Sequence, residues 1–161
     1  MLLNEITQPN DMQALKMRLQ SWSDWLTQGN HTPKEITDEL RNNMGDVADI
    51  VMKTSPNVDK GDMNASAAYD QDADQDGDIP FVIELYFSDK EDRMTITDPN
   101  PLVNRVQDMM KHEMLHQKQA QARDYEDHSA GTDTRDLNYE YMSRGDEIEA
   151  YAMNISDELY R

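Results

Sequence analysis

One stretch of the chain has the composition of a buried β-strand: Pro80-Phe81-Val82-Ile83-Glu84-Leu85-Tyr86-Phe87. Aromatic and β-branched side chains dominate it, and both types suit the pleated, half-buried surface of a sheet. Polar residues at 88–92 predict a turn, and the sequence Met-Thr-Ile-Thr at 94–97 predicts a second strand. We therefore expect a β-hairpin over residues 80–97.

Helices are predicted on both sides of this hairpin. Apolar residues recur at three- and four-residue steps between Met12 and Leu26, which predicts a core-facing helix. Asn100 and Pro101 have the cap-plus-proline pattern of a helix start and open a helix that we expect to run to about residue 123. A last helix is expected from about residue 146 to the end of the chain.

The segment 32–35, Thr-Pro-Lys-Glu, is a capping box with proline at the first helical position, and it predicts the start of another helix. Its apolar stripe continues through Met44 and Val47 to Val51, so we expect one helix across this whole region, weakened in the middle by Gly45.

Residues 54–78 lack apolar periodicity, and five aspartates alternate with other residues from Asp70 to Asp78. We expect a mobile acidic connection within one domain that spans residues 1–161. The segment 72–78 imitates the first half of an EF-hand loop, but its twelfth position is Ile83 instead of glutamate. A solvated acidic loop is therefore the expectation, with a looser calcium site as the alternative.

Composition narrows the class of protein. The chain has 161 residues, with 33 acidic against 15 basic side chains and a net charge of −18. This balance argues against binding to nucleic acid or to anionic membrane surfaces. Cysteine is absent, so any metal must be bound by histidine and carboxylate. No membrane span or signal peptide is recognisable, so we expect a soluble cytoplasmic protein of α+β class.

The expected helix 100–123 contains the segment His112-Glu113-Met114-Leu115-His116, an HExxH motif. Residues four apart lie on one face of a helix, so both imidazoles can reach one ion. Two neutral nitrogen ligands suit Zn²⁺, which takes a third protein ligand and keeps one position for water. Glu113 is placed to act as the general base on that water.

With this motif the chain resembles the zincin metallopeptidases over residues 80–161. The resemblance implies a minimal zincin-like domain, in which a small sheet covers the HExxH helix and a later helix supplies the third zinc ligand. It implies a peptide or protein substrate and a water activated by zinc. The strand 81–87 or its partner could offer an edge for an extended peptide.

The third ligand distinguishes the zincin branches. A metzincin would need histidine where this chain has Ala122, and an aspzincin-like pattern places Asp136 one position late. Residues 147–150 resemble the Glu-x-x-Ala helix of compact bacterial and phage gluzincin-like proteins, which makes Glu147 the ligand. Glu149, Asp136 and His128 stay open as alternatives.

An oxyanion donor is also expected between the motif and the last helix. Tyr141 is the candidate, with Tyr139 and His128 in the same segment. A different class of function competes with the peptidase: an acidic interaction protein or nucleic-acid mimic, in which the HExxH is structural or binds no metal.

Overall fold

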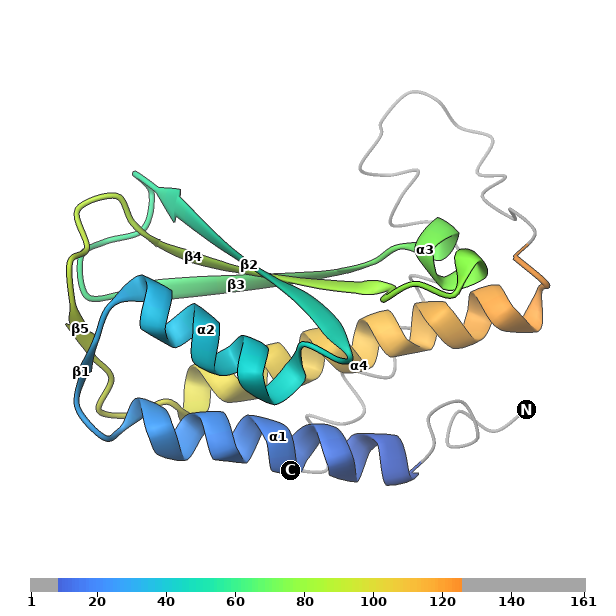
Figure 1. Cartoon of the computed structure of the whole chain (residues 1–161), viewed down its shortest axis with the longest axis horizontal. Helices are drawn as coiled ribbons and strands as arrows, with labels where there is room; N and C mark the ends of the chain where they lie inside the picture. The colour runs from blue at the N-terminus through green and yellow to red at the C-terminus, as the bar shows by residue number, and fades with distance from the viewer. Residues whose placement is uncertain (1–8, 126–161) are drawn as a thin grey trace.

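The computed structural model describes residues 9–125 and confirms a small α+β fold (Figure 1). The elements in chain order are α1 (Pro9–Leu26), β1 (Asn30–His31), α2 (Pro33–Met44), β2 (Ala48–Ser55), β3 (Met63–Tyr69), α3 (Gln71–Asp76), β4 (Phe81–Ser88), β5 (Met94–Thr95) and α4 (Asn100–Ala122). Within this part of the chain, no helix combines the length and apolar character needed to cross a membrane.

The predicted strand 81–87 is the centre of a three-stranded sheet with the order β2-β4-β3. β2 runs parallel to β4, and β3 runs antiparallel to it. Alternate residues of β4 are buried on one face, as a period of two requires: Phe81, Ile83, Leu85 and Phe87. These four side chains form the sheet side of the hydrophobic core.

Three helices cover that apolar face. α2 packs against β2, α4 packs against β3, and α1 lies against both helices (Figure 1). The predicted stripe of α1 is confirmed, since Leu15, Leu19, Trp22 and Leu26 are buried in the core. The indole N–H of Trp22 donates a hydrogen bond to the Ile36 carbonyl, 3.3 Å away, which satisfies its polar atom inside the core.

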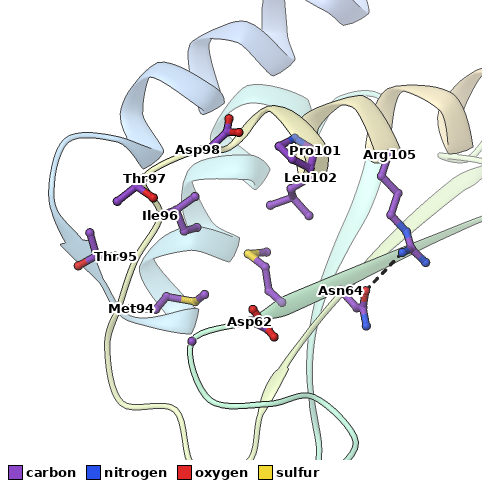
Figure 2. A pocket seen from close by; sticks show the side chains of 12 residues that line it. Asp62, Asn64, Met94, Thr95, Ile96, Thr97, Asp98, Pro101, Leu102 and Arg105 are labelled. Atoms are coloured by element: carbon purple, nitrogen blue, oxygen red, sulfur yellow. Dashed lines mark hydrogen bonds between the residues drawn. The ribbon is translucent and has the colours of Figure 1, made fainter.

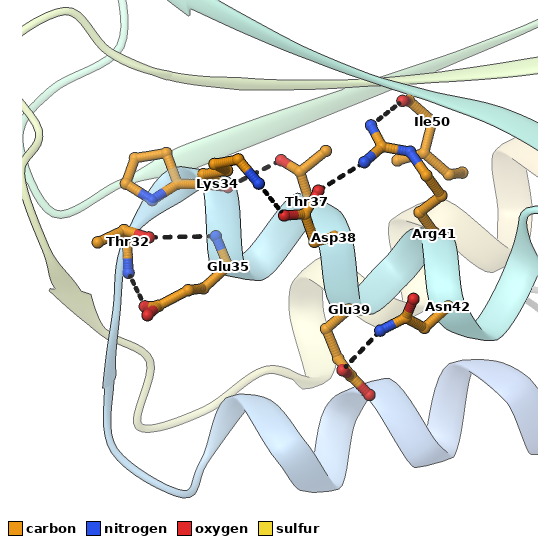
Figure 3. A network of polar contacts seen from close by, with 10 residues as sticks. Thr32, Lys34, Glu35, Thr37, Asp38, Glu39, Arg41, Asn42 and Ile50 are labelled. Carbon is orange, nitrogen blue, oxygen red and sulfur yellow. Dashed lines mark hydrogen bonds and ion pairs between the residues drawn. The ribbon is translucent and has the colours of Figure 1, made fainter.

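The predicted capping box begins α2. The Glu35 N–H donates to Thr32 Oγ1 at 3.1 Å, and the Thr32 N–H donates to Glu35 Oε2 at 2.8 Å (Figure 3). The hydrogen bond from the Thr32 backbone lowers the pKa of Glu35. One helical turn from its end, Arg41 donates to the Ile50 carbonyl at 2.8 Å and so connects α2 to β2 (Figure 3).

The prediction that this helix continues to Val51 is wrong. α2 ends at Met44, and Val51 lies on β2. The Gly45 N–H donates to the Arg41 carbonyl at 2.7 Å, and a Cβ on Gly45 would lie 2.7 Å from that same oxygen. The chain therefore turns at a position that no side chain could occupy unchanged, and β-branched residues then continue as a strand.

The predicted hairpin over 80–97 is also wrong. Both edges of β4 are already paired, one with β2 and one with β3, so residues 94 and 95 find another partner. They form β5, which pairs antiparallel with β1 through Asn30 and His31. A local strand pattern predicts a strand but does not fix its neighbour.

The predicted mobile connection 54–78 is ordered along much of its length. It contains β3, which pairs with β4 from Met63 to Tyr69, and the short helix α3. Three of the seven residues of β3 are alanines, which have low strand propensity, so tertiary pairing overrides the local preference.

The acidic segment 72–78 is not an open loop. The carboxylate of Asp70 accepts hydrogen bonds from the N–H groups of Asp72 and Ala73, at 3.0 and 3.1 Å, and so caps α3. Gly77 ends the helix with a φ of +82°, a left-handed conformation that suits glycine. Asp72 and Asp76 are exposed on this helix.

Asp74 is the exception, because its carboxylate fastens α3 to α4. It accepts from Tyr69 Oη at 3.0 Å, Gln117 Nε2 at 2.7 Å, Gln121 Nε2 at 3.2 Å and Tyr125 Oη at 2.9 Å. Burial acts to raise the pKa of Asp74, but the hydrogen bonds outweigh it and the net pKa is lowered. Burial and the nearby carboxylate raise the pKa of Tyr69.

Replacing Asp74 with asparagine should destabilise the fold, because one amide oxygen cannot serve four donors and the added NH₂ faces other donors. We expect Asp74→Asn to lower the free energy of unfolding by about 1–2 kcal/mol at pH 7. Asp76→Asn is the matched control on the same helix and should change it little. Urea denaturation followed by circular dichroism measures both.

The difference in stability between the wild type and Asp74→Asn should depend on pH. The folded pKa of Asp74 is lowered, so its contribution to stability is complete above the unfolded value of about 3.9 and is lost as pH falls through the folded pKa. The difference between wild type and Asp74→Asn should therefore shrink below about pH 4. A difference that is constant from pH 7 to pH 3 would show that the carboxylate charge is not involved.

Candidate metal site

The HExxH motif lies on α4, and the predicted extent of this helix is confirmed. The expected cap is shifted: Pro99 is the N-cap and Asn100 is already helical. The Asp98 carboxylate accepts a hydrogen bond from the Asn100 N–H at 3.1 Å and replaces the missing cap. Val106 and Met110 are fully buried, and their packing fixes the rotation of the helix about its axis.

The two imidazoles of the motif converge. His112 Nε2 and His116 Nε2 are 2.9 Å apart, and the rings meet edge to face with an angle of 77° between their planes. Both side chains are half-buried. In this arrangement the two nitrogens share either one proton or one cation.

The distance between the nitrogens fits a shared zinc ion. Two nitrogens at about 2.0–2.1 Å from a tetrahedral ion would be about 3.3 Å apart. His112 and His116 lie within a few tenths of an ångström of that separation, at 2.9 Å. The separation of the two nitrogens is therefore close to the one that a shared ion requires.

Glu113 lies beside this pair on the same turn of α4 and is half-buried. Viewed down the helix axis, the Cα atom of Glu113 is about 60° from that of His116 and about 100° from that of His112. The carboxylate is thus on the flank of the two imidazoles, where it can approach a molecule held by them without replacing either nitrogen. This placement suits a general base.

The stripe of α4 that contains the histidines follows β3. Residues 105, 109, 112 and 116 share one helix face because their spacing is three or four. At the start of this stripe, Arg105 Nη1 donates to Asn64 Oδ1 at 3.4 Å. Near its end, Gln117 donates to Asp74, which follows β3 in the chain. α4 and β3 therefore run side by side in the same direction.

This alignment places the histidines beside the second half of β3. His112 lies about 10 Å along α4 from Arg105, since each helical residue rises about 1.5 Å. The same length corresponds to about three residues of a strand, which leads from Asn64 to Ala67. On the sheet side, β3 is bonded to β4; among residues 9–125, no strand pairs with its other edge.

The structure brings together three of the predicted site residues: His112, Glu113 and His116 all lie on α4. Two others, Glu147 and Tyr141, are outside the described residues, as are the alternatives His128, Asp136, Tyr139 and Glu149. Residues 9–125 contain no group of three or more His, Asp or Glu side chains that could hold an ion. A three-ligand site at the histidine pair needs a ligand from another part of the chain.

β3, the strand that lies beside the histidines, was not predicted from the sequence. Three of its seven residues are alanines, whose low strand propensity argues against a strand. The contact between α4 and Asp74 does have a signal in the sequence. Gln117 and Gln121 follow the motif and are four residues apart, so they lie on one helix face, from which both donate to Asp74.

No protein-family model matches the chain, and no curated protein or solved structure shows significant similarity to it.

Proposed function

We propose that this chain is a zinc-dependent metallopeptidase, with His112, His116 and Glu147 as the zinc ligands. The observation that carries the proposal is the convergence of two imidazole nitrogens to 2.9 Å on a well-packed helix. The neighbouring carboxylate of Glu113 adds a base at the position that hydrolysis requires. Glu147 enters through the resemblance to gluzincin-like proteins.

Each residue has one role in the proposed reaction. Bound zinc would supply Lewis acidity and lower the pKa of a bound water towards about 7. Glu113 accepts the proton of the attacking water on its carboxylate and then delivers it to the nitrogen of the leaving amine. Tyr141 donates a hydrogen bond from its hydroxyl to the oxyanion that develops on the substrate carbonyl.

The outer edge of β3 supports a peptide as the substrate. An extended peptide can add to such an edge through main-chain hydrogen bonds. Antiparallel pairing is slightly more stable per residue than parallel pairing, so we expect the peptide to run opposite to β3. The peptide bond beside Ala67 would then lie next to the histidine pair.

Glu113→Gln tests the catalytic assignment directly. The amide cannot accept the proton, while both histidines are left in place, so zinc should stay bound and peptide hydrolysis should fall by at least about a hundredfold. Metal content by mass spectrometry and cleavage of a quenched fluorescent peptide library measure the two effects. Glu39→Gln, which changes a glutamate on α2, is the control and should keep both properties. Loss of zinc in Glu113→Gln would instead make Glu113 a ligand.

The third ligand is tested by a pair of variants. Glu147 and Glu149 project about 200° apart if both lie on one helix, so only one of them can reach the histidines. Glu147→Ala should weaken zinc binding by orders of magnitude, whereas Glu149→Ala should change it little. Competition with a chromophoric chelator gives both dissociation constants. The reverse order would assign the site to Glu149.

A further inference from the structure

A cavity of about 430 Å³ lies where β3 and α4 begin (Figure 2). Its walls come from the chain before and at the start of β3, from β5 and the segment after it, and from the first two turns of α4. Figure 2 shows Met94 of β5 and Leu102 of α4 on opposite sides of the space. The cavity is therefore bounded by two stretches that are distant in sequence, residues 61–64 and residues 94–105.

The walls are mixed in character, and their apolar part favours an apolar guest. Met63, Met94, Ile96 and Leu102 line the interior, and all four belong to the core or pack against it. Methionine side chains adapt to guests of different shape, which suits a pocket for more than one kind of large apolar side chain. Asp62 and Asp98 also line the cavity, together with one cation, Arg105, whose guanidinium donates to Asn64. The two carboxylates outnumber this single cation, so the balance of charge disfavours a carboxylate guest.

The cavity also lies at a definite distance from the histidine pair. Arg105 lines it and is on the same helix face as His112, about 10 Å away along α4. An extended peptide covers that distance with about three residues. If the peptide runs antiparallel to β3, it passes from Ala67 towards Met63, so the residues that reach the cavity follow the scissile bond.

We propose that this cavity binds a large apolar side chain of the peptide substrate, two or three residues C-terminal to the scissile bond. The position relative to the scissile bond rests on the proposed peptidase function, whereas binding of the side chain does not. The cavity selects leucine, methionine or phenylalanine over alanine, and it rejects aspartate and glutamate.

Binding is measured without turnover, on the full chain carrying Glu113→Gln. The probes are fluorescein-labelled ten-residue peptides of Ala, Ser and Gly, in which a single Leu, Ala or Asp is moved through each position. Anisotropy should show one position at which Leu binds at least about tenfold more tightly than Ala, with Asp weaker still. The labelled methyl groups of Met63 and Met94 should shift in NMR spectra with the Leu peptide and not with the Ala peptide.

Two variants and a control test whether the preference for Leu arises in the cavity. Thr97→Trp changes an exposed wall residue and should obstruct the space, and Ile96→Ala removes apolar wall surface. Both should reduce the preference for Leu to less than about threefold while the Ala peptide binds as before. Thr54→Trp alters an exposed threonine on β2, at the other edge of the sheet, and should keep the preference.

Cleavage of the same peptides by the wild-type chain separates the two proposals. Cleavage two or three residues before the preferred Leu supports both. Selective binding without any cleavage leaves the cavity proposal standing and contradicts the peptidase. Cleavage with no preference for Leu, absence of peptide binding, or a preference that persists in Thr97→Trp and Ile96→Ala overturns the cavity proposal.

Discussion

The burial of one face of β4 is the constraint on which the rest of the structure depends. Phe81, Ile83, Leu85 and Phe87 alternate along this strand and must be covered, and α1, α2 and α4 cover them. β2 occupies one edge of β4 and β3 the other, so within residues 9–125 the remaining edge of β3 lies beside α4 without a partner strand. The position of the histidine pair next to a strand edge is thus a consequence of how the core is closed.

One part of the surface of α4 packs against the rest of the fold, and another part presents the HExxH motif. Val106 and Met110 hold its first half against the core, while Asp74 binds Gln117 and Gln121 in its second half. The motif lies between these two anchors. A helix held at both ends can keep two imidazoles in one orientation at low entropic cost, which is the condition for a preorganised site.

Features that depend on neighbouring residues in the chain could be predicted from the sequence, and features that depend on tertiary contacts could not. α1, the start of α2, β4 and α4 were predictable because helix period, capping box and strand composition are local properties. The stop of α2 at Gly45 was missed because the apolar stripe through Val47 and Val51 also fits a helix. β3 and the partner of β5 were missed because strand pairing is decided by tertiary contacts. The approach of His112 and His116 to each other was predictable because a spacing of four on a helix already fixes their geometry, whereas a ligand from another element has no such signal.

Binding of zinc by His112 and His116 can be measured by X-ray absorption at the zinc edge, on the chain loaded with one equivalent of zinc. We expect two imidazole nitrogens at about 2.0–2.1 Å from the zinc, with oxygen completing the shell. We also expect one imidazole fewer in His112→Ala, and an unchanged spectrum in His31→Gln, where the altered histidine lies on β1. Failure to bind zinc stoichiometrically, or zinc bound without imidazole in the wild-type chain, would contradict zinc binding by His112 and His116.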